Sequence, residues 1–340
     1  MELTREILLH VAYSSTLATH RLRLVSRYVN VWVLPLLFHT LFFTTNDQII
    51  RFASTLLPKR KIHIPAIQSN LHTIPRSLSS YSIDSLALAV TTRLPSTETA
   101  LASVAPAFTG LKNLALTAQN LSSHAHWLRQ HPIHPQQVMI FHFGRPHPVN
   151  FREPLFNSVT HLHTSVLLGH RRSSVGDLPA LTHLAVYTRI DLQGSVIGDI
   201  ARLLYSTLVT MPRLKSLVLS LNGSALSDDL HTEPWFDPLL PCVQDKRFAF
   251  LPYIRIPRLE WQDIISGKQN IWERAEEWGR IASEDRHTRI MRSSQVLKAV
   301  EQENSVFPPV KKYVELEWEI DLVQRDDFSE LATDPMARRE

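Results

Sequence analysis

The stretch that decides the fold is Leu214-Lys215-Ser216-Leu217-Val218-Leu219, which places leucine at its first, fourth and sixth positions. The same spacing returns at Leu111–Leu116, and at Leu181–Val186 with valine in the last place. Weaker copies begin at Val159 and at Ile83. The starts at 83, 111, 159, 181 and 214 lie 28, 48, 22 and 33 residues apart, so the pattern is an irregular repeat.

Repeats of this length predict a stacked α/β architecture. A unit of about 20–35 residues with one strand and one helix cannot bury its apolar face alone, so such units stack into a solenoid. The longest interval has room for a further strand near Val138, and 247–256 reads as the last strand. Between strands, 198–211 predicts a crossover helix with Ile200 and Leu204 on one face. The uneven spacing favours an irregular solenoid over a regular horseshoe.

The chain of 340 residues divides into three predicted regions. Residues 1–43 form a short helical unit, and 44–258 form the leucine-rich-repeat-like α/β solenoid. Residues 259–340 hold a helical region, an amphipathic strand at 314–322 and a polar tail. Three tryptophans of the helical region, Trp261, Trp272 and Trp278, either pack into the core or form a binding platform.

Composition argues against an enzyme. Only 9 glycines are present, and no glycine-rich phosphate loop, G-x-S-x-G or H-E-x-x-H motif occurs. The single cysteine, Cys242, excludes an intramolecular disulfide and a cysteine-based zinc site. Six histidines crowd 124–147, but no carboxylate lies between Thr99 and Arg152 to orient them as metal ligands. We therefore expect no catalytic residues, no cofactor and no metal.

Charge and hydropathy limit the classes of partner that the protein can bind. The formal net charge is +4, with 17 Lys/Arg against 9 Asp/Glu in 1–200 and the opposite bias beyond. This balance is too even for a nucleic-acid-binding protein, although a local positive field favours an acidic partner surface. No apolar run is long enough to span a membrane and no secretory signal begins the chain. We expect an intracellular protein, cytoplasmic or nuclear, that binds neither nucleic acid nor membrane.

The first residues contain two amphipathic segments. Leu3, Ile7, Leu8 and Val11 share one face of a helix, and a second helix from about 19 to 33 carries its own apolar positions. Those positions are Leu22, Val25, Val29, Trp32 and Val33. Because about 40 residues make a poor core, apolar surface remains for a partner or for the solenoid.

This unit resembles an F-box. The residues that carry the resemblance are Leu3-Thr4-Arg5-Glu6-Ile7-Leu8, then Leu22-Arg23-Leu24-Val25-Ser26-Arg27, then Trp32. Later segments are similar to the degenerate leucine-rich region of F-box-like proteins of basidiomycete (mushroom-forming) fungi, and these are Pro179–Leu184, Met211–Leu219 and Ile271–Glu276. Thr4 stands where the family has proline, and the middle of the motif, Tyr13 to Arg21, is about one residue short.

The resemblance implies a substrate receptor of a Skp–cullin–F-box ubiquitin ligase. In that role Leu3, Ile7, Leu8, Val11, Leu22 and Val25 would bind the Skp-type linker protein, and the exposed face of the solenoid would bind an unknown target protein. The alternative is a stand-alone leucine-rich-repeat scaffold with a relic F-box. Exposure of Leu3, Ile7, Leu8 and Leu22 together favours the first function, and burial of these side chains against the solenoid favours the second.

Overall fold

The computed structural model describes residues 4–8, 11, 21–22, 24–26, 28–29, 32–33, 39–56, 83–90, 94–123, 126–131, 133–141, 149–164, 175–189, 195–222, 237–251, 257–282 and 302. The protein is an α/β structure built on one eight-stranded parallel sheet whose strand order is the order of the sequence. The strands are β1 (Thr40–Phe43), β2 (Ser85–Leu88), β3 (Asn113–Thr117), β4 (Gln137–Phe141), β5 (His161–Thr164), β6 (His183–Arg189), β7 (Ser216–Asn222) and β8 (Phe248–Leu251).

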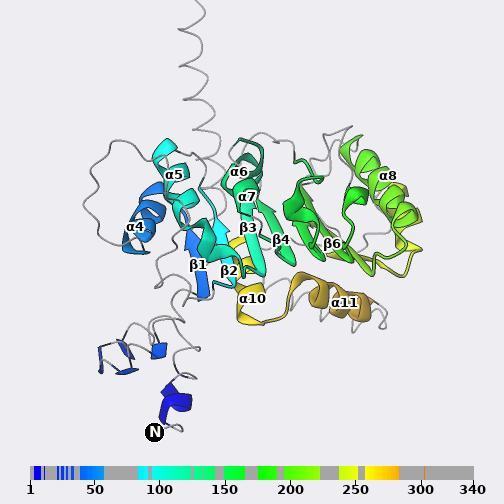
Figure 1. Cartoon of the computed structure of the whole chain (residues 1–340). Helices are drawn as coiled ribbons and strands as arrows, with labels where there is room; N and C mark the ends of the chain where they lie inside the picture. Colours follow the sequence, from blue (N-terminus) through cyan, green and yellow to red (C-terminus); the bar gives the residue numbers. More distant parts are fainter. Residues whose placement is uncertain are drawn as a thin grey trace, which may run out of the picture.

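Helices and short 3-10 turns connect the strands. The α-helices are α4 (Asn46–Leu56), α5 (Pro95–Val104), α6 (Ala118–Ser123), α7 (His126–Gln130), α8 (Ser195–Thr210) and α9 (Leu240–Val243), and the 3-10 turns are η1 (Ala105–Phe108), η2 (Pro154–Phe156), η3 (Val175–Asp177) and η5 (Asp237–Leu239). Figure 1 shows these helices along one side of the sheet, which we call the crossover face. Each strand is one step of an open, solenoid-like stack.

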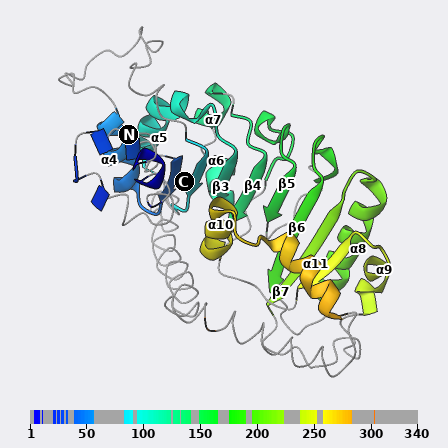
Figure 2. The same ribbon diagram turned by 90° about the horizontal axis from the view of Figure 1, so that it is seen from below.

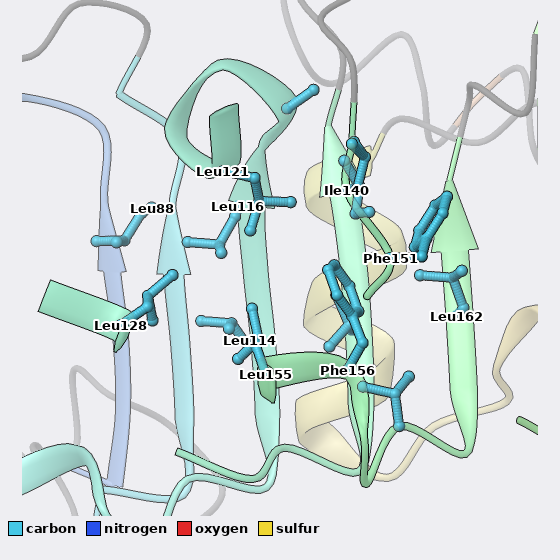
Figure 3. Close-up of a cluster of buried hydrophobic side chains, with 14 of the residues drawn as sticks. Leu88, Leu114, Leu116, Leu121, Leu128, Ile140, Phe151, Leu155, Phe156 and Leu162 are labelled. Carbon is cyan, nitrogen blue, oxygen red and sulfur yellow. The ribbon is translucent and has the colours of Figure 1, made fainter. Parts of the chain in front are cut away.

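The register keeps equivalent residues of the repeat beside one another. Leu86 pairs with Leu114, Leu114 with Val138, Leu162 with Leu184, and Leu184 with Leu217. At every one of these positions the side chain is buried in the core of the crossover face. Figure 3 shows how strand leucines meet Leu121, Leu128, Phe151, Leu155 and Phe156 from the connecting segments. The L-x-x-L-x-L spacing therefore corresponds to this buried face.

The opposite side, which we call the return face, is also covered. Two C-terminal helices, α10 (Pro257–Ser266) and α11 (Ile271–Ala282), lie across it in Figure 2. Trp261 of α10 packs with Ala87, Ala115 and Met139, and a second cluster joins α11 to β6, β7 and β8. A parallel sheet with apolar side chains on both faces needs cover on both.

The predicted strands and the main crossover helix are confirmed. The repeat copies at 83, 111, 159, 181 and 214 lead into β2, β3, β5, β6 and β7, the expected strand near Val138 is β4, and α8 lies where a helix was expected. The predicted 1–43 unit includes β1, which pairs with β2 and belongs to the sheet. The amphipathic strand expected at 314–322 lies outside the described residues.

Candidate interaction surfaces

The described part of the N-terminal unit has its own small cluster. Val29 and Val33 are buried there, and Leu8, Leu22 and Trp32 pack against them half-buried. Residues 4–8 are helical, as are 21–22, 28–29 and 32–33. Ser26 Oγ accepts a hydrogen bond from the backbone N–H of Val29 at 3.2 Å, which places a serine where a helix start needs an acceptor.

Five large apolar side chains remain exposed around this cluster. They are Ile7, Val11, Leu24, Val25 and Tyr28, and they make half of the ten such side chains among the described residues. Of the residues predicted to bind a linker, Ile7, Val11 and Val25 belong to this exposed set, whereas Leu8 and Leu22 belong to the cluster. Leu3 lies outside the described residues. The predicted set thus divides into an exposed group and a packed group.

On the return face, local sequence signals position α11. Gly267 follows α10 with a φ of 65°, a conformation that other residues adopt at a cost. Asn270 then caps α11, because its Oδ1 accepts hydrogen bonds from the N–H groups of Trp272 and Glu273, each at 3.0 Å. Glu273 returns the bond by accepting from the Asn270 N–H at 2.9 Å, which completes a capping box.

Arg274 of α11 ties the two helices together. Its side chain forms ion pairs with Glu260 and, at 3.5 Å, with Asp263, both on α10. All three side chains are at most 10% exposed, and Arg274 also donates to the carbonyl of Gln269 at 2.5 Å. Buried charges are tolerated only when paired in this way, so α10 and α11 depend on each other.

A repeated Thr-His pair begins two neighbouring strands beneath α11. Thr160 precedes His161 at the start of β5, and Thr182 precedes His183 at the start of β6. The Thr160 hydroxyl lies 3.1 Å from the Gln136 carbonyl and 2.9 Å from His161 Nδ1. The second pair repeats this arrangement, with Thr182 Oγ1 3.1 Å from the Thr160 carbonyl and 2.8 Å from its own histidine.

The threonine contacts hold both imidazole rings in place. Each carbonyl beside a threonine hydroxyl, of Gln136 and of Thr160, also accepts hydrogen bonds from two backbone N–H groups. Each histidine Nδ1 shares a hydrogen bond with its own threonine hydroxyl, and the tautomer of the ring decides which of the two groups donates.

The two imidazoles stack beneath one indole. The His161 and His183 ring centroids are 4.2 Å apart with planes 5° from parallel, because the strand register places these residues side by side. Trp272 of α11 meets both rings edge-on, at 5.0 Å from His161 and 5.9 Å from His183. We call these three side chains the His–Trp stack.

Burial and neighbouring cations disfavour protonation of the stack. Burial lowers the pKa of His161 to about 4, helped by His183 and Lys215. Burial also lowers the pKa of His183, with Lys215 acting in the same direction and Glu276 of α11 opposing it. Both rings are therefore neutral at neutral pH.

His163 is a third histidine on this face. It is 4% exposed and lies in the apolar row between Met139 and Ala185. Neither ring nitrogen has a hydrogen-bond partner, and its ring contacts Tyr187 edge-on at 5.3 Å. Burial, with the charge of Arg274, lowers its pKa to about 3.

The sequence held a signal for this site. The triplet Thr-His-Leu occurs at 160–162 and again at 182–184, one repeat later. The sequence analysis considered the histidines at 124–147 because they lie close together along the chain. It missed His161 and His183, which are close only because they occupy equivalent positions of the repeat. Strand register brings residues 22 positions apart into contact.

The class of protein is thus an α/β solenoid-like sheet covered by helices on both faces, with five large apolar side chains exposed among its N-terminal residues. Comparison with models of known protein families, with curated proteins and with solved structures finds no match to this chain. Within the described ranges, no helix is both long and apolar enough to cross a bilayer.

Proposed function

We propose that the protein is a non-enzymatic interaction module whose N-terminal residues bind a Skp-type linker protein, as the F-box resemblance implies. The observation that supports this is the exposure of five large apolar side chains within the N-terminal residues, namely Ile7, Val11, Leu24, Val25 and Tyr28. In this proposal the remainder of the chain carries a target protein to the ligase.

The exposed and packed groups have separate roles in this proposal. Leu8 and Leu22 support the helices by packing on Val29 and Val33, so their replacement would test folding and not binding. Ile7 and Val25 are exposed, so a charge at either position should leave the unit folded. These two positions therefore give the informative variants.

The test is co-purification of the full chain with a fungal Skp-type linker protein. We expect a stable complex with the unmodified chain, and at least about tenfold weaker binding for Ile7→Asp and Val25→Asp, since a buried unpaired charge costs several kcal/mol. The matched control is Val209→Asp, because Val209 of α8 is 64% exposed and far from the N-terminal residues in sequence. This control should bind normally.

Absence of a complex with a folded chain would overturn the linker proposal. The chain would then be a stand-alone scaffold with a relic F-box. Equal binding by Val25→Asp and the unmodified chain would show that a different surface binds the linker.

A further inference from the structure

We propose that α10 and α11 form a detachable strap on the return face, which is held while the His–Trp stack is neutral and is released when the stack takes up protons. The proposal concerns the chain's own contacts and does not depend on linker binding. The strap is defined as residues 257–282. It is a pH-sensitive contact built into the fold, and its release uncovers the return face of the sheet.

The first argument is that the strap's largely apolar interface contains buried polar atoms without hydrogen bonds. Among the described residues, eight buried side-chain atoms have no hydrogen-bond partner. Six of them belong to return-face strands or to the strap: one in Gln137, two in His163, and one each in Trp261, Trp272 and Arg274. Each such atom has lost its hydrogen bonds to water without gaining a new one. This loss costs free energy and weakens the attachment of the strap to the sheet.

The second argument is the geometry of the stack. A neutral imidazole carries one proton, so an added proton makes each ring an imidazolium with both nitrogens protonated. Two imidazolium rings 4.2 Å apart would repel each other beneath Trp272. Once the strap leaves, water solvates both rings, so protonation favours the open state.

The surrounding charges do not neutralise the protonated stack. Lys215 at the start of β7 and Arg274 on α11 are cations. Glu260 and Asp263 of α10 already pair with Arg274. Gln137, the register partner of His161 on β4, is uncharged. Within the described ranges, Glu276 of α11 is the carboxylate that favours a charged His183, and it lies on the strap itself.

The direction of the pH effect follows from proton linkage, because a fall in pH favours the state that binds more protons. The pKa of His161 rises from about 4 when covered towards 6.5 when exposed, so the open state binds more protons below pH 6.5. The closed state therefore loses stability as pH falls through that range. With allowance for its partial exposure, His161 alone weakens closure by roughly tenfold near pH ~5.

The test is amide hydrogen exchange of the full chain near pH ~7.5 and ~5, with labelling times corrected for the intrinsic pH dependence of exchange. We expect protection of 257–282 to fall by roughly tenfold or more at the lower pH, while β3 and β4 keep theirs. The double variant His161→Phe/His183→Phe keeps an aromatic stack that cannot titrate, and it should lose most of this response. His134→Phe, at an exposed histidine, should retain it.

Three results would overturn the proposal. They are unchanged amide protection of 257–282 at the lower pH, loss of protection in the strap and the strands together, or an undiminished pH-dependent loss of strap protection in the double variant. If the double variant does not fold, the single variants give the same test, because each removes one proton site. Each should then show a smaller response than the unmodified chain.

Discussion

On the crossover face the sheet packs leucine against leucine, whereas on the return face it packs alanine, histidine and methionine against a strap with buried ion pairs. The crossover core is continuous from Leu41 to Leu219 along the strands and includes helices from every part of the solenoid. The return face divides into two smaller clusters, one beneath each strap helix. The comparison shows that one sheet can combine a cooperative core on one side with a separable contact on the other.

The largest expected effect is loss of strap attachment to the sheet. Arg274→Leu leaves the carboxylate of Glu260 buried without its arginine and removes the ion pair with Asp263, which should destabilise strap attachment by about 3–5 kcal/mol. Limited proteolysis should then cut within 257–282 while thermal unfolding of the remaining domain changes little. The matched control is Arg280→Leu on the same helix, where an exposed ion pair with Glu277 should contribute less than about 1 kcal/mol. Simultaneous loss of the whole fold would contradict the division into two faces.

The next effect concerns the crossover core. Leu116→Ala removes a fully buried side chain and should lower the free energy of unfolding by about 2–5 kcal/mol, because the cavity cannot collapse in a close-packed core. Chemical denaturation followed by circular dichroism measures it. Leu94→Ala, at a half-exposed leucine, should change stability by less than about 0.5 kcal/mol. If Leu116→Ala loosened the strap alone, the crossover face would not be the cooperative core.

The smallest expected effect is a gain in the stability of strap attachment. His163→Met extends the apolar row from the neighbouring Met139 and removes two buried nitrogens that lack hydrogen bonds. Strap attachment should strengthen by about 1–2 kcal/mol, measured as slower amide exchange in 257–282. His134→Met at an exposed position should have no such effect. Weaker attachment in His163→Met would show that this imidazole makes a favourable contact despite its lack of hydrogen bonds.

Some local features depend only on residues close together in the chain. Thr45 and Gln48 form a capping box at α4, with Gln48 Oε1 3.2 Å from the Thr45 N–H and Thr45 Oγ1 3.3 Å from the Gln48 N–H. On α11, Ile271 and Ala275 are four residues apart and are both buried on the sheet. Such signals lie within four residues of each other, so the chain alone specifies them.

The solenoid was expected to bind a target protein, without assignment of the face that binds it. The strands carry Ala115, Met139 and Val218 on the return face, an apolar row that the strap covers. Of the three tryptophans left open between core and platform, Trp261 and Trp272 are buried there, and Trp278 packs half-buried against the same face. Periodicity identifies which side chains need cover, but it does not identify which distant segment supplies it.

The sequence by itself determined the strands, their order of stacking and the leucines of the crossover core. The physical reason is that every copy of the repeat buries side chains at the same positions against the next copy, so the leucine spacing itself marks the buried positions. Only the tertiary structure decided that Thr160-His161 and Thr182-His183 meet beneath Trp272, and that Arg274 holds two helices over the sheet. Trp272 lies 111 positions from His161 in sequence, and the chemistry of these contacts depends on register, burial and charge that arise together on folding.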